Sequence, residues 1–465
     1  MDNYRTIRGW RAASLFIVCV LGMLSTQAQI VSAPLAKQER AIYALTAKEA
    51  VGFARKNNIQ VKKALQDVLQ QQQKNREITA NALPQLNGSL NYTDNLKLPV
   101  SLLPAEFFGG TPGTYTPIKF GVQHTATVGA SLEQILFDGQ VFVGLQARAA
   151  SIELYQKNVE ITEEAVAVNV YKVYYQLLIG QQQLALYHDN IVRFEKLLHD
   201  TREIHKNGFA EQLDVDKVNV TLTNLLTDSV KLRTQINNGF LGLKILVGVP
   251  ISDSIVQTEV FSNDRLKENI FDTAFRYENR REYQALQIGK QLNEYNVKRY
   301  KYSYLPSLTA FGQYFTNAQR NKFDFFKGGG DWFQQGAVGI RLSLPIFDGF
   351  RKDAQIKQAR IDVRKTELDI ESLKLQIDND VQSSWRRLRD AVIAVDAQQQ
   401  NMELAEKVYD QTKKKYEQGL GSNTEINTAQ TEMRTAQTNY FSSLYDATIA
   451  RIDYIKATGK ILNDQ

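Results

Sequence analysis

Few side chains in this sequence are of types that could carry out covalent or metal-assisted chemistry. There are four histidines, at 124, 188, 199 and 205, and a single cysteine, Cys19. His188, His199 and His205 lie in one proline-free stretch, but their spacings of eleven and six residues do not give adjacent ligands on one helix face. We therefore predict no catalytic residue, no metal site and no cofactor.

Two carboxylates stand at positions where their charge could matter. Asp214 and Glu425 each come six residues after a glycine, Gly208 or Gly419, that follows a long helical pattern. An acidic residue in the first turn of a helix interacts favourably with the helix dipole, by ~0.3 to 1 kcal/mol. Favourable placement at the start of a helix is therefore sufficient to explain both carboxylates.

Glycine-rich loops are expected at 97–121 and 317–331. A phosphate site is not predicted, because neither loop is followed by the Lys-Ser/Thr pair of a P-loop or embedded in a βαβ unit. Trp332, Phe333, Tyr314 and Phe315 near the strand ends better suit an aromatic belt at a membrane interface.

The N-terminal residues have the pattern of a secretory signal. Arg5, Arg8 and Arg11 precede a 13-residue apolar run from Ala12 to Leu24, and small residues up to Ala28 follow it. A membrane anchor would need ~20 apolar residues. We expect a signal peptide over residues 1–28, which leaves the mature chain without cysteine.

The charge distribution gives no reason to predict a nucleic-acid partner. The chain has 56 Lys+Arg against 50 Asp+Glu, and these charges are interspersed along helical stretches instead of forming a basic block. Such a pattern is typical of solvated helix faces.

The sequence contains one unit twice. Each copy reads as helix, strand, loop, strand, long helix, turn and helix. Short segments recur in the same order 210 to 222 residues later: Leu83–Leu86 as Leu305–Leu308, Phe137–Gly139 as Phe347–Gly349, Gly208 as Gly419, and Gly248 as Gly459.

Two stretches of 67 residues, 140–206 and 350–416, contain no proline. Each predicts a helix about 100 Å long at ~1.5 Å per residue, which must pack along its neighbours. Residues 46–82 are also expected to form one helix. A mostly apolar heptad seam, in steps of three and four, predicts coiled-coil packing. It comprises Ile377, Val381, Ser384, Leu388, Ala391, Val395, Gln398, Met402, Ala405, Tyr409, Thr412 and Tyr416, and again Val215, Val218, Leu222, Leu225, Ser229, Leu232 and Ile236.

The predicted strands alternate between an apolar and a polar face, which is typical of a water-lined barrel wall in lipid. Phe311 and Phe315 are exceptions, because they fall on the expected polar face. The resulting division is a signal peptide at 1–28, a first repeat at 29–250 (strands about 85–95 and 122–136, long helix about 140–206), a linker at 251–267, and a second repeat at 268–465 (strands about 307–316 and 334–346, long helix about 350–416).

Four strands cannot close a barrel, and open sheet edges are not tolerated in lipid. Closure must then be shared between subunits. Two subunits would give eight strands, whose interior side chains tend to fill, whereas three would give twelve and leave room for a channel. A trimer is therefore favoured.

Over the whole mature chain, the sequence resembles the TolC-like outer-membrane efflux protein family. The resemblance rests on segments that occur in the family's order: Glu49-Ala50-Val51, Asn57-Asn58, Leu83-Pro84-Gln85-Leu86, Leu132 to Phe137-Asp138-Gly139, Val173-Tyr174-Tyr175-Gln176-Leu177-Leu178, and the turns at Gly208 and Gly419.

The family resemblance implies a mixed α/β membrane protein with two tandem repeats. It implies a homotrimer with a 12-stranded transmembrane β-barrel in outer-membrane lipid and an α-helical barrel extending into the periplasm. The periplasmic entrance would be lined by Asp214, Tyr416 and Glu425. Tyr416 matches the family's gate tyrosine, whereas Gly421 stands where some members carry a gate arginine. The tips that meet a periplasmic adaptor would be Gly208, Phe209, Ala210, Gly419, Leu420 and Gly421.

The expected function is that of a passive exit duct in a tripartite efflux pump, without enzymatic activity. The resemblance implies that a periplasmic adaptor (membrane fusion) protein links it to an inner-membrane pump of RND or ABC type. Two alternatives remain at this point: a type I protein secretion channel, and a periplasmic coiled-coil structural protein.

Overall fold

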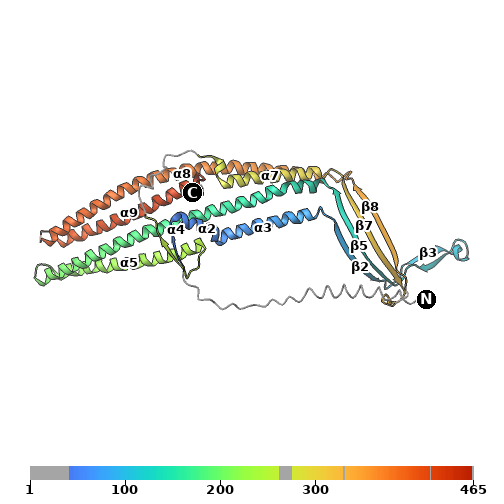
Figure 1. The fold of residues 1–465 in the computed structure, drawn as a ribbon, viewed down its shortest axis with the longest axis horizontal. Coiled ribbons are helices and arrows are strands. Elements are labelled where there is room, and N and C mark those ends of the chain that lie inside the picture. Colours follow the sequence, from blue (N-terminus) through green and yellow to red (C-terminus); the bar gives the residue numbers. More distant parts are fainter. Residues whose placement is uncertain (1–40, 261–274, 328–329, 419, 463–465) are drawn as a thin grey trace.

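The computed structural model describes residues 41–260, 275–327, 330–418 and 420–462. The chain is elongated, with a β-sheet at one end and long helices running away from it (Figure 1). The described elements are β1 (Ile42–Leu45), α2 (Ala47–Asn57), α3 (Ile59–Ala80), β2 (Gln85–Asp94), β3 (Val100–Pro104), η1 (Ala105–Phe108), β4 (Tyr115–Lys119), β5 (His124–Phe137), α4 (Gly139–Lys206), α5 (Gln212–Val247), β6 (Ser254–Gln257), η2 (Tyr277–Asn279), α7 (Arg281–Tyr302), β7 (Ser307–Arg320), β8 (Phe333–Ser343), α8 (Arg351–Glu417) and α9 (Asn423–Ala457).

The main sheet has four antiparallel strands in the order β2-β5-β7-β8. Its register places apolar residues of all four strands on one face. Leu90 pairs with Val128, and Ala310 pairs with Ile340 on the same side. Several of these side chains are more than 60% exposed in the single chain, namely Leu86, Leu90, Val338, Ile340 and Leu342. The predicted apolar and polar faces are confirmed.

The pairing of the strands explains why two phenylalanines lie on the polar face. Phe311 pairs with Gly339 and Phe315 pairs with Gly129. A Cβ added to Gly339 would lie 2.8 Å from the Phe311 ring, and one added to Gly129 would lie 2.2 Å from the Phe315 ring. Each ring therefore covers the backbone of a cross-strand glycine, which is a known way of stabilising glycine in a sheet.

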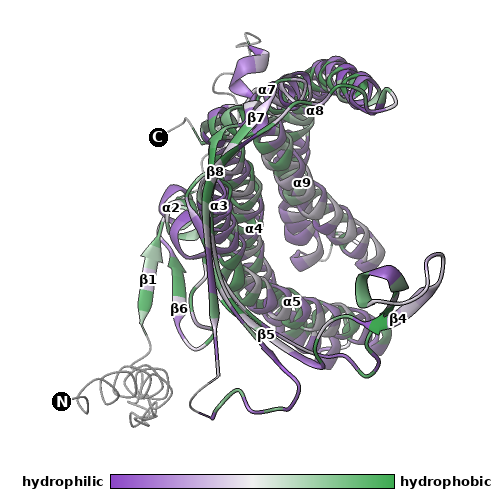
Figure 2. Ribbon diagram, turned by 90° about the vertical axis from the view of Figure 1, so that its right-hand side faces the viewer, coloured by the Kyte–Doolittle hydropathy of each residue, from purple (hydrophilic) through white to green (hydrophobic). Residues whose placement is uncertain are grey.

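The long helices pack as the heptad pattern predicts. Every position of the predicted seam on α8 is buried or half-buried, and the same holds for the seam on α5. The core near the helix ends joins α4, α5, α8 and α9 through Phe194, Leu225, Tyr409 and Met433. Seen along its length, the chain is a curved wall in which hairpins α4–α5 and α8–α9 are neighbouring parts (Figure 2).

The single helix predicted over residues 46–82 is wrong, because the helix is interrupted at Asn58. This residue leaves the helical conformation (φ −59°, ψ 135°), and its side chain accepts a hydrogen bond from Gln60 N at 2.8 Å. Its Nδ2 also donates to the Leu246 carbonyl oxygen at 2.8 Å, near the end of α5. The interruption lets one side chain cap two helices.

The second repeat makes the same junction with a different residue. Arg280, which precedes α7, donates from Nη1 to the Ala457 carbonyl oxygen at 3.1 Å, at the end of α9. Gly248 and Gly459 follow the two returning helices with φ of 80° and 72°. Matching junctions at matching sequence positions confirm the tandem-repeat fold.

Two segments contain structure that the sequence did not predict. Strand β6 lies in the predicted linker at 251–267 and pairs in parallel with β1. The predicted loop at 97–121 holds the β3–β4 hairpin, which projects beyond the sheet (Figure 1). Strand β8 ends at Ser343, before the predicted end at 346, and β7 continues past 316 to Arg320. The signal peptide lies outside the described residues, and the repeat boundaries stay a prediction.

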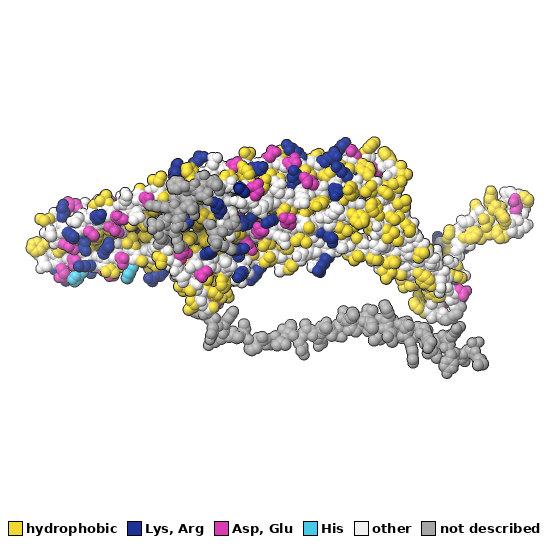
Figure 3. Space-filling view, turned by 45° about the horizontal axis from the view of Figure 1, so that its top comes forward, with side chains coloured by type: hydrophobic (Ala, Val, Ile, Leu, Met, Phe, Trp, Pro, Cys, Tyr) yellow, Lys and Arg dark blue, Asp and Glu magenta, His cyan; other side chains and the backbone are white. Residues whose placement is uncertain are grey.

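Hydrophobic side chains gather over the sheet and the adjoining helix ends, whereas charged side chains are scattered over the helices (Figure 3). Within the described ranges, no helix combines the length and the apolar character needed to cross a membrane.

Candidate functional site

The first hairpin tip connects α4 to α5 through residues 207–211. Gly208 adopts φ of 80°, a conformation that favours glycine. The Phe209 amide then donates to the Ile204 carbonyl oxygen at 3.1 Å, which ends α4. The His205 ring Nδ1 lies 2.8 Å from the Ala210 carbonyl oxygen, and since a carbonyl only accepts, this nitrogen donates. The tip is thus a closed, hydrogen-bonded turn.

The second tip, between α8 and α9, repeats this turn. The Leu420 amide donates to the Lys415 carbonyl oxygen at 2.9 Å, 211 positions after the corresponding pair. A Cβ at Gly421 would lie 3.2 Å from the Tyr416 backbone nitrogen, so little room remains there. Gly419 lies outside the described residues.

Each tip presents one large apolar side chain. Phe209 is 86% exposed and Leu420 is 77% exposed, and they occupy matching positions in the two repeats. Both belong to the predicted docking tips. An exposed apolar residue at the end of each hairpin gives a partner a contact that burial would stabilise.

Asp214 performs the helix-capping role that its position predicts and one further role. Its Oδ2 accepts a hydrogen bond from the Glu211 amide at 3.3 Å, as part of a capping box at the start of α5. Its Oδ1 accepts from Nδ2 of Asn423, the first residue of α9. Asp214 therefore joins the start of one hairpin's returning helix to the start of the other's.

Tyr416 lies close to this link. It packs at the edge of the core that surrounds Phe194 and Tyr409. Burial raises the pKa of Tyr416 above its ordinary value, the negative charge of Asp214 acts in the same direction, and Thr201 opposes it. The phenol is therefore neutral at physiological pH.

The structure does not bring Glu425 into this group within one chain. Its backbone N–H donates a hydrogen bond to Ser422 Oγ at 3.2 Å, while its side chain is exposed. Of the three predicted entrance residues, Asp214 and Tyr416 are neighbours, whereas Glu425 lies in the first turn of α9.

Sequence reasoning missed two polar links between the hairpins. Asn190 on α4 donates to Gln437 Oε1 on α9 at 2.8 Å, and both side chains are buried. Arg434 on α9 pairs with Asp228 on α5. The amide side chains of Asn190 and Gln437 could have indicated the first link, because a polar residue in an otherwise apolar seam often fixes the register of a coiled coil.

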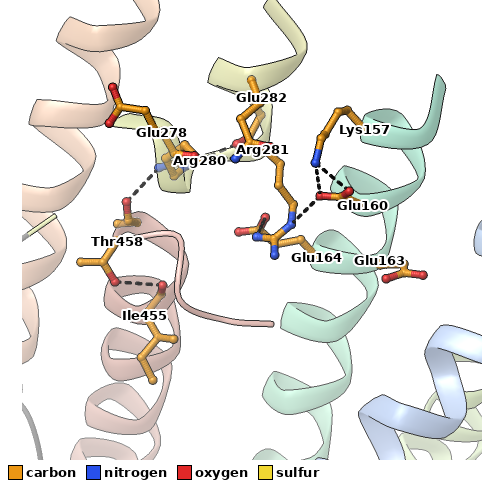
Figure 4. Close-up of polar contacts among 12 residues, drawn as sticks. Lys157, Glu160, Glu163, Glu164, Glu278, Arg280, Arg281, Glu282, Ile455 and Thr458 are labelled. Atoms are coloured by element: carbon orange, nitrogen blue, oxygen red, sulfur yellow. Dashed lines mark hydrogen bonds and ion pairs between the residues drawn. The ribbon is translucent and has the colours of Figure 1, made fainter. Parts of the chain in front are cut away.

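A buried ionic cluster lies at the junction of the repeats (Figure 4). Arg281 at the start of α7 contacts Glu164 at 3.2 Å and Glu160 at 3.5 Å, both on α4. Glu160 also pairs with Lys157 at 2.8 Å. The pKa of Glu164 is raised, mainly by burial and then by Glu282, although Arg281 and Arg280 oppose the shift. The cluster joins α4 of the first repeat to the start of α7 in the second.

The histidines are spread over separate surroundings. His124 lies in β5, where its Nδ1 is 3.0 Å from the Tyr92 hydroxyl, whereas His205 holds the first tip. Among the residues that the structure describes, no group of three or more His, Cys, Asp or Glu is placed to hold a metal ion.

Known proteins share both the sequence pattern and the fold. A family model described as outer membrane efflux protein matches residues 51–249 and 277–460. The outer membrane protein TolC of Vibrio cholerae is 20% identical over 340 residues, covering 72% of this chain and 77% of that one. The outer membrane efflux protein BepC of Brucella suis is 22% identical over 389 residues, covering 82% and 78%. A crystal structure of CusC superposes with a TM-score of 0.71 at 15% identity, covering 89% of this chain and 92% of that one.

Proposed function

Because the chain belongs to the outer membrane efflux protein family, we propose that it forms the passive exit duct of an export system. Three copies would assemble into one channel that crosses the outer membrane and continues through the periplasm. The duct supplies a path, and the free energy for transport comes from an inner-membrane pump.

The observation that carries this proposal is the sheet β2-β5-β7-β8. Strands β2 and β8 are its edges within the described part of the chain, and one face is lined by exposed apolar side chains. An unpaired backbone group in lipid costs several kcal/mol, so the edges must pair with other copies. Three copies of four strands give a twelve-stranded barrel, wide enough for a water-filled interior.

The helices support the periplasmic part of the proposal. Helices α4 and α8 have 68 and 67 residues, which corresponds to about 100 Å each. They extend from the sheet in one direction (Figure 1). Charged residues are scattered over their surface, as expected for helices in water.

The proposal assigns a role to the hairpin tips and to the entrance residues. The exposed Phe209 and Leu420, with Gly208, Ala210, Gly419 and Gly421, would contact a periplasmic adaptor that joins the duct to a pump of RND or ABC type. Asp214, Tyr416 and Glu425 would line the entrance. The link between Asp214 and Asn423 supports this role, because it holds the two hairpins of one subunit together at their ends.

The test is an assembly and conductance measurement on detergent-extracted protein. Native mass spectrometry should give a trimer, and the same sample should conduct ions in planar bilayers. The native protein should also fractionate with outer membranes. A stable monomer that conducts would contradict the shared barrel, and a soluble periplasmic species would favour a structural coiled-coil protein instead.

A further inference from the structure

A cavity of about 250 Å³ lies where α3, α4 and α7 pack side by side, between the ionic cluster and the sheet. Gly144 and Ala147 of α4 line it, and because glycine has no side chain and alanine only a methyl group, the space stays open. A Cβ at Gly144 would have only Ile78 as a neighbour, at 3.8 Å. The exit-duct function described above makes no use of this cavity.

The side chains around the cavity are positively charged or neutral. Arg148 on α4 and Arg299 on α7 line it, and none of the lining residues is acidic. Both arginines are half-buried, and within the described ranges neither takes part in an ion pair, whereas the half-buried Arg55 and Lys172 each pair with a carboxylate. Two cations that line the same open-sided cavity repel each other, and an anion between them reduces that repulsion.

Arg148 is held in place and still has donors to spare. Its Nε donates to the Leu145 carbonyl oxygen at 3.0 Å, and its Nη1 donates to Thr79 Oγ1 at 2.7 Å. Asn75 holds the same turn by donating to the Arg148 carbonyl oxygen at 2.9 Å. A guanidinium has five N–H donors, so three of them remain for a ligand.

Arg299 is the less satisfied of the two. Its Nε is buried and has no hydrogen-bond partner in the described part of the chain. Its guanidinium stacks 4.8 Å from the centroid of the Tyr300 ring, which orients the planar group. A buried charged donor without an acceptor is costly, and a bound water, ion or ligand can satisfy such a group.

We propose that this cavity binds the anionic oxygen group, phosphate or carboxylate, of a small molecule between Arg148 and Arg299. Planar guanidinium groups match both kinds of oxyanion through paired N–H···O bonds. The Asn296 amide, which also lines the cavity, adds a neutral donor. The volume admits a small anion and is too small for most drug-sized molecules.

Binding of inorganic phosphate and of benzoate to the purified, detergent-solubilised trimer tests the proposal. Isothermal titration in chloride-free buffer should show saturable binding of at least one of the two anions. Arg299→Gln should weaken that binding about tenfold or more, as expected for loss of a charged hydrogen-bond donor. Arg299→Lys keeps the charge without the planar fork and should give an intermediate affinity.

The matched control is Arg360→Gln, which removes an exposed arginine from α8, and it should bind as the parent does. Phosphate without benzoate binding would assign the site to phosphate groups, and the reverse would assign it to carboxylates. Absence of saturable binding of both anions by the parent, or equal binding by the parent and Arg299→Gln, would overturn the proposal. Because the readout is binding alone, its failure is distinguishable from a failure of the exit-duct function.

Discussion

Arg281, the first residue of α7, donates a hydrogen bond across 3.2 Å to the carboxylate of Glu164 on α4. One residue belongs to each repeat, so this pair joins the two copies of the fold (Figure 4). Glu164 is only 2% exposed, and its Oε1 has no hydrogen-bond partner in the described part of the chain. The hydrogen bond from Arg281 therefore only partly replaces the hydration that the carboxylate loses on burial.

This environment predicts a pH-dependent effect of Glu164→Gln. Burial raises the pKa of Glu164 in the folded protein, so its contribution to stability is present below the unfolded-state pKa and is lost as pH rises through the folded-state pKa. Glutamine keeps an acceptor for Arg281 without titrating. The melting temperature of the variant minus that of the parent should increase between about pH 4 and pH 8.

Glu153→Gln on the same helix is the control for that experiment, because Glu153 is exposed. The difference in melting temperature between Glu153→Gln and the parent should stay nearly constant over the same pH range. A Glu164→Gln difference that fell as pH rose would show that the ion pair with Arg281 outweighs the burial of the carboxylate.

Two glycines in the first repeat should respond in opposite ways to alanine. Gly208→Ala places a side chain at φ of 80°, which costs about 1–2 kcal/mol, whereas Gly242→Ala falls inside α5 with no atom within 4 Å of the new Cβ and should gain up to ~1 kcal/mol. Amide hydrogen exchange at residues 203–214 should accelerate about 5- to 30-fold in the first variant. In the second, exchange in α5 should slow. If alanine changed amide exchange in the same direction at both glycines, the left-handed conformation of Gly208 would be contradicted.

The exposed apolar tips should carry adaptor binding. Phe209→Ser and Leu420→Ser each remove a side chain that is free in the single chain, so trimer yield and melting temperature should match the parent. Affinity for the adaptor, measured by surface plasmon resonance, should fall about tenfold or more if each residue is a hot spot. Ile251→Ser changes an apolar residue that is 52% exposed and lies after α5, away from the tips, and it should leave the affinity unchanged. Unaltered affinity in both tip variants would place the adaptor elsewhere.

The features that the sequence predicted well are local and periodic. The seam on α8 repeats over many turns, so tertiary packing reinforces each position, and the tip turn at Gly208 follows from a single residue's conformational freedom. Strand alternation likewise needs no knowledge of distant residues. These patterns were enough to place the long helices and the four strands of the sheet.

The features that it missed depend on contacts between distant segments. The interruption at Asn58 lets its side chain donate to the carbonyl oxygen of Leu246, which is 188 positions away in the sequence. The four-residue strands β1 and β6 are too short to show a period of two. The bond between Asp214 and Asn423 exists because the two hairpins pack side by side, and no spacing within either hairpin reveals it.

The entrance gives the last prediction, that Asp214 contributes more than Glu425 to cation preference. Glu425 is exposed and screened by solvent and salt, whereas Asp214 is half-buried and fixed by Glu211 and Asn423. Three copies of each carboxylate around a narrow mouth would reinforce one another's field. Asp214→Asn keeps one acceptor oxygen for Asn423, but its NH2 group cannot accept from the Glu211 amide. Trimer yield and melting temperature equal to the parent's are therefore required before a change in selectivity is assigned to the lost charge.

Single-channel recording across a salt gradient should show the ratio of cation to anion permeability falling in Asp214→Asn, falling less in Glu425→Gln, and approaching ~1 in the double variant. Block by a trivalent cation should weaken by about tenfold or more in the double variant, because six negative charges per trimer are lost. Glu371→Gln, an exposed carboxylate on α8 away from the tips, should keep the parent's preference. If the double variant retains both the parent's cation preference and its sensitivity to the blocker, these two carboxylates do not line the entrance.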